Sequence, residues 1–243
     1  MTRTQQDREQ IRVAVSTVIL TLRRDGDDVR PRIVLPLVKR TRAPHQNSWS
    51  LPGGWLGAEE NLEDAAARTL HETTGLSPSY LEQLYAFGAV NRSPSRVVSI
   101  VYWALLRSDE VDAQSAAHVA SGLAPENVRW FDAGALPELA FDHTQILDYA
   151  QWRLRNKVGY SRIANGFLPP MFTLADLREA YEAILGNRLD PANFRRQVEA
   201  SGTLLPTEEF RTGSHRPARL YRYNDAVELA DRGPLSTEEK RTR

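Results

Sequence analysis

Runs of apolar and β-branched residues predict five strands in the first half of the chain. The first two, 12–22 and 32–38, flank the turn sequence Asp-Gly-Asp-Asp and predict a hairpin. The other three are predicted over 84–90, 97–106 and 128–131. Between the second and third strands, a loop over 43–51 leads into Pro52-Gly53-Gly54, which we expect to form a tight turn that uses the backbone freedom of glycine.

Apolar residues at helical spacing predict two helices in the same half, over 62–74 and 143–157. Asn61 occupies the N-cap position of the first helix, acidic residues fill its first turn, and Gly75 ends it. The polar, small and acidic stretch 108–127 predicts a surface loop, with room for a helical turn. Strands that enclose a long helix in this order favour a mixed α and β domain.

The pattern changes after the chain-breaking sequence Leu168-Pro169-Pro170. A helix over 174–185 and another that starts with Pro191 at its first position follow. Two short strands, 204–206 and 219–223, come after them, and a polar, basic segment joins the two strands. The helix over 143–157, these two helices and the two-stranded hairpin together have the element order of a winged helix-turn-helix.

The amino-acid composition excludes several kinds of site and several classes of protein. With 41% apolar and 26% charged residues, the 243-residue chain has ordinary globular composition. Cysteine is absent, which excludes disulfides, cysteine-ligated metals and a cysteine nucleophile. The polar N-terminus has no signal-peptide core, and the most apolar early run is too short to span a bilayer. We therefore expect a cytoplasmic protein without membrane contact.

The zero net charge conceals a difference between the two halves. Residues 1–150 carry 15 basic and 19 acidic residues, whereas residues 151–243 carry 16 and 12. The stretch 151–223 has a net charge of +5. A basic second half is compatible with nucleic-acid binding, although so small an excess by itself marks a solvated surface more often than a DNA-binding face.

A long spaced motif covers the Gly-Gly turn and the first predicted helix. It resembles the Nudix box, and its matching residues are Gly54, Glu60, Arg68, Leu70, Glu72, Gly75 and Leu76. The resemblance implies a Nudix fold, an α/β/α sandwich with a mixed sheet between helices. In that family, glutamates at i, i+3 and i+4 of the helix hold Mg²⁺ on a diphosphate.

This sequence departs from the box at two of those three positions. Thr69 and Thr73 replace family glutamates, and only Glu72 remains. Because Mg²⁺ requires hard oxygen ligands, neutral hydroxyls are poor substitutes for carboxylates. We therefore predict a degenerate Nudix box with no catalytic residue and no metal site. The alternatives are that the box is only a fold element, or that other carboxylates sustain a working hydrolase.

Side chains near the predicted turn are candidates for contact with a diphosphate ligand. Arginine binds phosphate in bidentate fashion, and tryptophan can stack on a base. The predicted ligand-binding residues are Arg40, Trp49, Gly53, Gly54, Arg92 and Arg96. Solvated loop arginines and a packing tryptophan are an equally good explanation for each of these residues taken singly.

The helix that starts with Pro191 carries side chains suited to reading base edges. In a winged helix, this helix enters the major groove, and Asn, Arg and Gln pair with bases there. Phe194 and Val198 are expected to pack inward. The predicted DNA-binding residues are Thr173, Asn193, Arg195, Arg196, Gln197, His215, Arg216 and Arg219. A protein-interaction module is the main alternative, because winged helices also serve that purpose.

Taken together, the two halves resemble the NrtR family, the bacterial Nudix-related transcriptional regulators of NAD metabolism. The resemblance implies a Nudix-like sensor over 1–150, a winged helix-turn-helix domain over 151–230 and a disordered tail over 231–243. It also implies a homodimer that binds a palindromic operator and represses genes of NAD biosynthesis or salvage. ADP-ribose or a related NAD metabolite would be the effector, with no other cofactor. A Nudix hydrolase with an accessory domain, and a scaffold whose two halves both bind proteins, remain as alternatives.

Overall fold

The computed structural model describes residues 11–24, 30–78, 81–121, 127–159, 161–212 and 217–227. Within these ranges the chain forms two compact units. The first contains the described residues from 11 to 152 other than 30–31, and the second begins at 153. The predicted Asp-Gly-Asp-Asp turn and the tail 231–243 lie outside the described residues.

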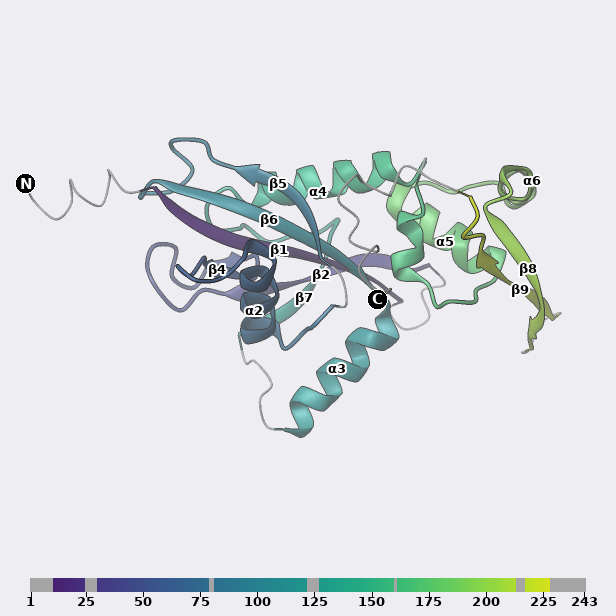
Figure 1. Cartoon of the computed structure of the whole chain (residues 1–243), viewed down its shortest axis with the longest axis horizontal. Coiled ribbons are helices and arrows are strands. Elements are labelled where there is room, and N and C mark those ends of the chain that lie inside the picture. Colours follow the sequence, from purple (N-terminus) through teal and green to yellow (C-terminus); the bar gives the residue numbers. More distant parts are fainter. Residues whose placement is uncertain are drawn as a thin grey trace, which may run out of the picture. The chain divides into compact units, whose positions relative to one another are not determined.

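A mixed seven-stranded sheet forms the centre of the first unit (Figure 1). Its strands are β1 (Arg12–Arg23), β2 (Arg32–Lys39), β3 (Trp49–Ser50), β4 (Gly53–Trp55), β5 (Glu82–Phe87), β6 (Val97–Leu106) and β7 (Val128–Asp132). The main order is β3-β2-β1-β6-β5, with β4 paired to β1 and β7 paired to β2. Strands β1 and β6 are parallel, while the other pairs are antiparallel. The predicted hairpin is present as the pair of β1 with β2.

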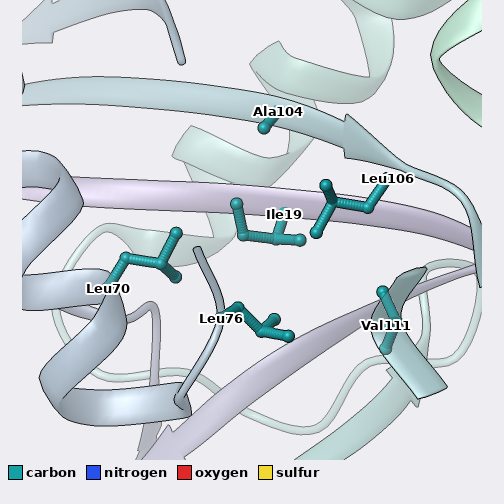
Figure 2. Close-up of a cluster of buried hydrophobic side chains, with 6 residues drawn as sticks. All are labelled: Ile19, Leu70, Leu76, Ala104, Leu106 and Val111. Atoms are coloured by element: carbon teal, nitrogen blue, oxygen red, sulfur yellow. The ribbon is translucent and has the colours of Figure 1, made fainter. Parts of the chain in front are cut away.

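The alternation of side chains along β1 and β6 separates the two faces of the sheet. On one face, Ile19, Ala104 and Leu106 pack against Leu70 and Leu76 at the end of α2 (Leu62–Thr74), and Val111 of α3 (Ser108–Ala120) joins them (Figure 2). Figure 1 shows α2 and α3 on this face, and α4 (His143–Lys157) on the other. This sandwich agrees with the predicted fold class. Because β1 and β6 have helices on both faces, they read as nearly continuous apolar runs.

Helix α2 has the predicted bounds, and its ends differ in how they are satisfied. Gly75 ends the helix in the left-handed conformation, with φ of 74°, and its N–H donates to the His71 carbonyl. Asn61 occupies the N-cap position, but its side chain makes no cap hydrogen bond. Its amide instead donates to the Asp64 carboxylate at 2.9 Å. Asn61 therefore occupies the predicted N-cap position, but its side chain does not make the hydrogen bond of an N-cap.

The stretch predicted as a surface loop over 108–127 contains a helix, α3 (Ser108–Ala120). Only Val111 of this helix is buried, so the sequence has no apolar stripe from which the helix could be predicted. Its stability comes from local features: alanine has high helix propensity, and the Glu110 side chain accepts from the Arg107 backbone N–H. Residues 122–126 lie outside the described part.

The second unit has the predicted element order. After the short 3₁₀ turn η1 (Ile163–Phe167) come helices α5 (Leu174–Leu185) and α6 (Pro191–Ser201), then the antiparallel strands β8 (Leu204–Arg211) and β9 (Ala218–Tyr223). Phe172, which is fully buried, exchanges two backbone hydrogen bonds with Tyr221 of β9. This bridge attaches the hairpin to the segment that leads into α5. None of the helices in the described ranges combines the length and the apolar character that a membrane span requires.

Candidate ligand cavity and DNA-binding surface

A cavity of about 550 Å³ opens on the α4 side of the sheet in the first unit. Small residues form its floor: Ala14 and Ser16 on β1, Ser99 on β6 and Gly53 on β4. Loop residues 40, 42–44 and 92–95 and the turn before α4 form its walls. A volume of this size is typical of sites for small ligands. The cavity exists because four neighbouring positions on one face of the sheet carry almost no side chain.

Gly53 and Gly54 line the cavity, but for a different reason from the predicted turn. Both lie in strand β4, and neither has the positive φ that glycine alone tolerates. A Cβ on Gly53 would lie 2.4 Å from the Val15 carbonyl oxygen, and one on Gly54 would lie 2.8 Å from Thr69 Cγ2. Glycine is therefore required here for close packing of β4 on β1 and on α2.

Arg92 forms a wall of the cavity and is held by a buried ion pair. Its Nε and Nη2 donate to the two Asp142 oxygens at 2.7 and 2.6 Å, and Nη1 donates to Ser99 Oγ at 2.7 Å. The Arg92 side chain is 5% exposed and that of Asp142 is 10% exposed. The bidentate geometry that suits phosphate is thus already occupied by Asp142. Arg92 shapes the cavity and fixes the turn before α4.

His143, the first residue of α4, is a cavity residue that the sequence did not predict. The Leu51 backbone N–H donates to its Nδ1 at 2.9 Å. Burial lowers the pKa of His143 to about 4, a shift that Asp142 partly opposes. The ring is therefore neutral near pH 7, and Nε2 carries the proton. This wall of the cavity offers a hydrogen-bond donor without a charge.

Arg40 and Phe141 form a second wall. The Arg40 guanidinium lies 4.7 Å from the centroid of the Phe141 ring, and its Nε donates to the Pro44 carbonyl at 2.9 Å. Phe141 itself has a φ of 57°, which is uncommon for a bulky residue. Desolvation lowers the pKa of Arg40, although a guanidinium stays charged at any physiological pH. Arg40 thus directs a positive charge to the cavity wall.

Two of the predicted ligand contacts do not line this cavity. Trp49 packs edge-on against Phe131, with ring centroids 4.9 Å apart. Arg96 donates from Nη1 to the Gly88 carbonyl at 2.9 Å. Both side chains therefore have contacts elsewhere, and their role in ligand binding stays a prediction.

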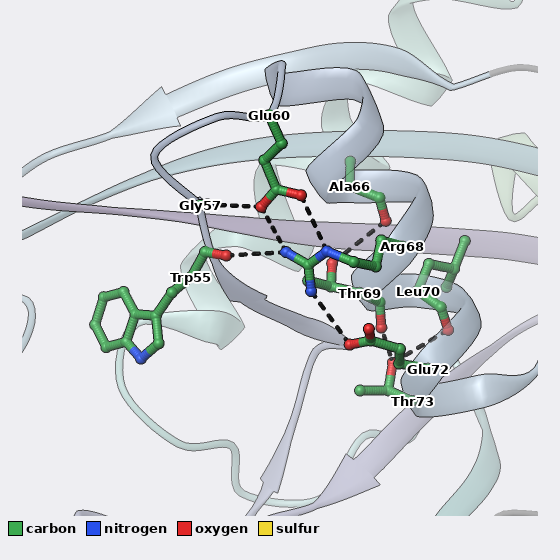
Figure 3. A network of polar contacts seen from close by, with 9 residues as sticks. All are labelled: Trp55, Gly57, Glu60, Ala66, Arg68, Thr69, Leu70, Glu72 and Thr73. Carbon is green, nitrogen blue, oxygen red and sulfur yellow. Dashed lines mark hydrogen bonds and ion pairs between the residues drawn. The ribbon is translucent and has the colours of Figure 1, made fainter.

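The Nudix-box residues form a polar network on the outer side of α2 (Figure 3). Arg68 donates to both oxygens of Glu60, at 3.0 and 2.6 Å, to Glu72 at 3.2 Å and to the Trp55 carbonyl at 3.2 Å. The Gly57 backbone N–H also donates to Glu60. Hydrogen bonds from Arg68 and Gly57 lower the pKa of Glu60 below its ordinary value. The network ties the loop after β4 to the helix.

The side chains at the three metal positions do not fit Mg²⁺. Thr69 is 2% exposed, and its hydroxyl donates to the Ala66 carbonyl at 3.3 Å. The Thr73 hydroxyl donates to the Thr69 carbonyl at 2.6 Å. Both hydroxyl groups thus bond to the backbone of their own helix, and Glu72 is engaged by Arg68. In the described residues, no three histidine or acidic side chains gather as a metal site.

In the second unit, α6 presents the face that its sequence predicted. Phe194 is 7% exposed and packs against Tyr181, with ring centroids 5.3 Å apart, and Val198 is half-buried. The predicted readers of base edges lie exposed on the other side of the helix: Asn193, Arg195, Arg196 and Gln197. Pro191 begins the helix, and Asp190 caps it by accepting from the Asn193 backbone N–H.

Two of the exposed arginines on α6 have partners on the same helix. Arg196 donates to the Asn193 side-chain oxygen at 2.8 Å, and Arg195 pairs with Glu199 at 2.9 Å. The pairing with Glu199 raises the pKa of Arg195. Bonds of this kind between exposed side chains cost little to exchange for contacts with another polar surface. These two contacts thus order the exposed arginine side chains of α6 and leave their charges accessible to solvent.

The hairpin and the start of α5 hold the other predicted DNA contacts. Arg219 on β9 is exposed, and its guanidinium lies 5.3 Å from the Phe210 ring. Thr173 is 5% exposed and caps α5 through a reciprocal pair of bonds with Asp176, of 2.8 and 3.1 Å. Its hydroxyl thus has a structural partner. His215 and Arg216 lie outside the described residues.

Comparison with known proteins places this geometry in a family. Residues 12–150 match the Nudix domain family, and residues 165–223 match the NrtR DNA-binding winged helix domain. The chain is 35% identical over 192 residues to the ADPR-responsive transcriptional repressor NtrR of Acinetobacter baylyi, covering 77% of this chain and 74% of that protein. The chain belongs to the NrtR family.

Two further relatives of this NrtR-family chain differ in how much of it they match. The crystal structure of Shewanella oneidensis NrtR complexed with a 27mer DNA aligns with a TM-score of 0.71 at 32% identity, covering 87% of this chain and 93% of that one. The ADP-ribose pyrophosphatase of Methanocaldococcus jannaschii is 34% identical over 119 residues, covering 48% of this chain and 66% of that protein. The first of these spans both units, and the second covers about half of the chain.

Several residues that line or fix the cavity of this NrtR-family member carry no signal in the sequence. Phe141, Asp142 and His143 follow one another in a segment whose pattern predicts only the start of a helix. Their importance follows from packing, because the fold places them beside Arg40 and Arg92, about 50 to 100 residues away in the chain. Acidic and aromatic residues that precede a helix occur in many unrelated positions, so no motif could have identified them.

Proposed function

We propose that this protein is a DNA-binding transcriptional repressor of NAD biosynthesis or salvage genes, and that its Nudix domain senses ADP-ribose or a related NAD metabolite. The observation that supports this most strongly is that one chain carries both parts of such a device. The α6 face presents polar readers of bases, and the Nudix unit keeps a ligand cavity while its metal positions hold threonine. The relative from Acinetobacter baylyi that matches 77% of this chain is named an ADPR-responsive transcriptional repressor.

The proposal includes a cytoplasmic homodimer that binds a palindromic operator. Two recognition helices placed one helical turn apart on DNA fit two half-sites of a palindrome. ADP-ribose would act by preferring a dimer geometry in which the two helices no longer match that spacing. A ligand shifts this equilibrium only by the difference between its affinities for the two geometries, so tight binding alone does not suffice.

The test is fluorescence anisotropy on duplex DNA from upstream of NAD-synthesis genes, with and without ADP-ribose. We expect selective binding over scrambled DNA, and an affinity that changes by a factor of at least about five with ligand. Selective binding that ignores ADP-ribose would support the repressor and remove ADP-ribose as effector. Equal affinity for scrambled DNA across several salt concentrations would contradict the proposal, because phosphate contacts alone carry no sequence information.

A Nudix hydrolase of ADP-ribose-like diphosphates is the second candidate. The relative named ADP-ribose pyrophosphatase favours it, as does the intact network of Glu60, Arg68 and Glu72. Against it stand the two threonines, whose hydroxyls bond to helix carbonyls. We propose that hydrolysis is absent or very slow.

Turnover of ADP-ribose with Mg²⁺ separates the two candidates. We expect no release of AMP above the uncatalysed background from the wild-type protein. Robust turnover that the Glu72→Gln variant abolishes would instead establish the hydrolase, with Glu72 as its surviving carboxylate. Because Glu72 is exposed on α2, with a side-chain exposure of 58%, this substitution leaves the core intact.

A further inference from the structure

Trp55 is an exposed aromatic residue on the wall of the ligand cavity. The residue is 46% exposed and is one of those that line the cavity. It lies directly opposite Ala14 in the antiparallel pair of β4 with β1, so both side chains point to the cavity face of the sheet. Since Ala14 fills little space, the Trp55 ring borders open volume. An indole exposed to water loses apolar area when a flat ligand covers it.

An arginine backs this indole. The Arg12 guanidinium lies 3.7 Å from the centroid of the Trp55 ring, a separation of direct cation–π stacking. Arg12 is two residues before Ala14 on β1 and therefore shares its face of the sheet. The stack restrains the indole, and the residue nevertheless stays 46% exposed. A ring held in this way loses little rotamer freedom when a ligand stacks on it.

Positive charge gathers on a different wall. Arg40 and Arg42 both line the cavity. The bond to Pro44 uses Arg40 Nε, and among the described residues no hydrogen bond involves its terminal nitrogens. The Arg92 guanidinium, in contrast, is already paired with the Asp142 carboxylate. The cavity thus has the Trp55 indole on one wall, Arg40 and Arg42 on another, and small residues on its floor.

We propose that Trp55 is the stacking platform for the base of a nucleoside diphosphate ligand, with the diphosphate directed toward Arg40 and Arg42. This inference rests on the proposed function and assigns the orientation of the ligand that it names. It also replaces Trp49, which the sequence favoured for stacking and which packs on Phe131. The backbone carbonyl of Trp55 serves the Arg68 network, so its side chain and its main chain have separate roles.

The test uses calorimetry with two probes, ADP-ribose and ribose 5-phosphate, which lacks the base. In Trp55→Ala we expect ADP-ribose affinity to fall roughly 10- to 100-fold, the usual effect of removing one stacked base contact. The ratio of the two affinities should fall by the same factor, because only ADP-ribose loses a contact. Trp55→Phe should recover most of the affinity. Trp49→Phe is the matched control and should leave both affinities unchanged.

Tryptophan fluorescence supplies an independent readout. Base stacking quenches an indole, so ADP-ribose should quench the wild-type and Trp49→Phe proteins and leave Trp55→Phe unquenched while it still binds. If Trp55→Ala loses affinity for both probes equally, the side chain acts through the fold and the stacking proposal is wrong. Unchanged ADP-ribose affinity in Trp55→Ala would also overturn it. If the wild-type protein binds no ADP-ribose, the proposed function fails instead.

Discussion

The ligand cavity and the α6 surface are assembled in opposite ways. Segments from β1, β4 and β6, two loops and the start of α4 meet at the cavity, and they are spread over 130 residues of the chain. The α6 surface comes from a single helix of 11 residues. The charges differ too, since Arg92 and Asp142 are paired and buried at the cavity, whereas Arg195 is 64% exposed on α6.

This difference reflects what each surface binds. A small ligand needs walls that are fixed before it arrives, and buried pairs fix them because an unpaired charge in the interior is costly. DNA offers a large charged surface in water, so exposed and exchangeable arginines suit it. Substitutions in the buried ion pair at the cavity should therefore act mainly on stability, and substitutions on α6 mainly on affinity.

The largest expected effect is that of Arg92→Leu. It leaves Asp142 buried without its cation, which typically destabilises a protein by about 3–5 kcal/mol. Urea unfolding of the first unit measures this, and Arg32→Leu is the matched control. Arg32 pairs with Asp132 at 3.3 Å on the surface, with side-chain exposures of 46% and 30%. Loss of this surface ion pair should lower the free energy of unfolding by about 0–1 kcal/mol. Equal losses in the two variants would contradict the distinction drawn between them.

The next effect is a pH dependence from His143. Its pKa is about 4 in the folded protein, against about 6.5 in the unfolded chain. The unfolded state therefore binds more protons between these values, and stability falls as the pH drops through this window. By about pH 5 the loss should reach roughly 2 kcal/mol relative to about pH 7. Urea unfolding at both pH values checks this. In His143→Gln that part of the slope should disappear, and a persisting slope would assign it to other groups.

Arg196→Ala tests the other side of the comparison. We expect operator affinity to fall by roughly 1–3 kcal/mol, the usual value of a side chain that reads a base. Stability should stay within about 0.5 kcal/mol, because the side chain is exposed. Anisotropy on specific and scrambled DNA measures the affinity, with Arg107→Ala in the first unit as a control. An unchanged operator affinity at several salt concentrations would remove α6 as the recognition helix.

Thr173→Ala should have the smallest effect, and it separates two roles for one residue. Loss of the cap on α5 should destabilise the second unit by about 1 kcal/mol. Thr173→Ser retains the hydroxyl and should retain most of the stability. Thermal unfolding of both variants measures this. A variant that keeps its stability but loses DNA affinity would show that the hydroxyl contacts DNA, as the sequence predicted.

Local signals made much of the fold predictable. The bounds of α2, α4, α5 and β6 follow from periodicity and capping, and the hairpin of β1 with β2 follows from two apolar runs around a turn. The failures have physical causes. Helix α3 has one buried residue and therefore no stripe, and β3 and β4 are too short to show alternation. Strand β5 begins and ends earlier than predicted because its bounds depend on pairing with β6.

The candidate sites show the same difference between contacts that are local in the sequence and contacts between distant segments. The Glu60–Arg68 pair and the exposed face of α6 join residues within eight positions or one helix, so spacing alone predicts them. The contacts of Arg92 with Asp142, 50 positions away, and of Leu51 with His143, 92 positions away, depend on how the strands cross. Trp49 and Trp55 look alike in the sequence, and strand pairing alone decides which of them lines the cavity.

By itself the sequence determined helices α2, α4, α5 and α6, the winged-helix order, the substituted Nudix positions and the polar face of α6, because each is a pattern within one or two turns or strands. The tertiary structure alone decided the cavity, since a cavity is a volume that several distant segments leave unfilled. Ala14, Ser16, Gly53 and Ser99 are ordinary small residues until β1, β4 and β6 place them side by side. At that point their small size becomes the floor of a binding site.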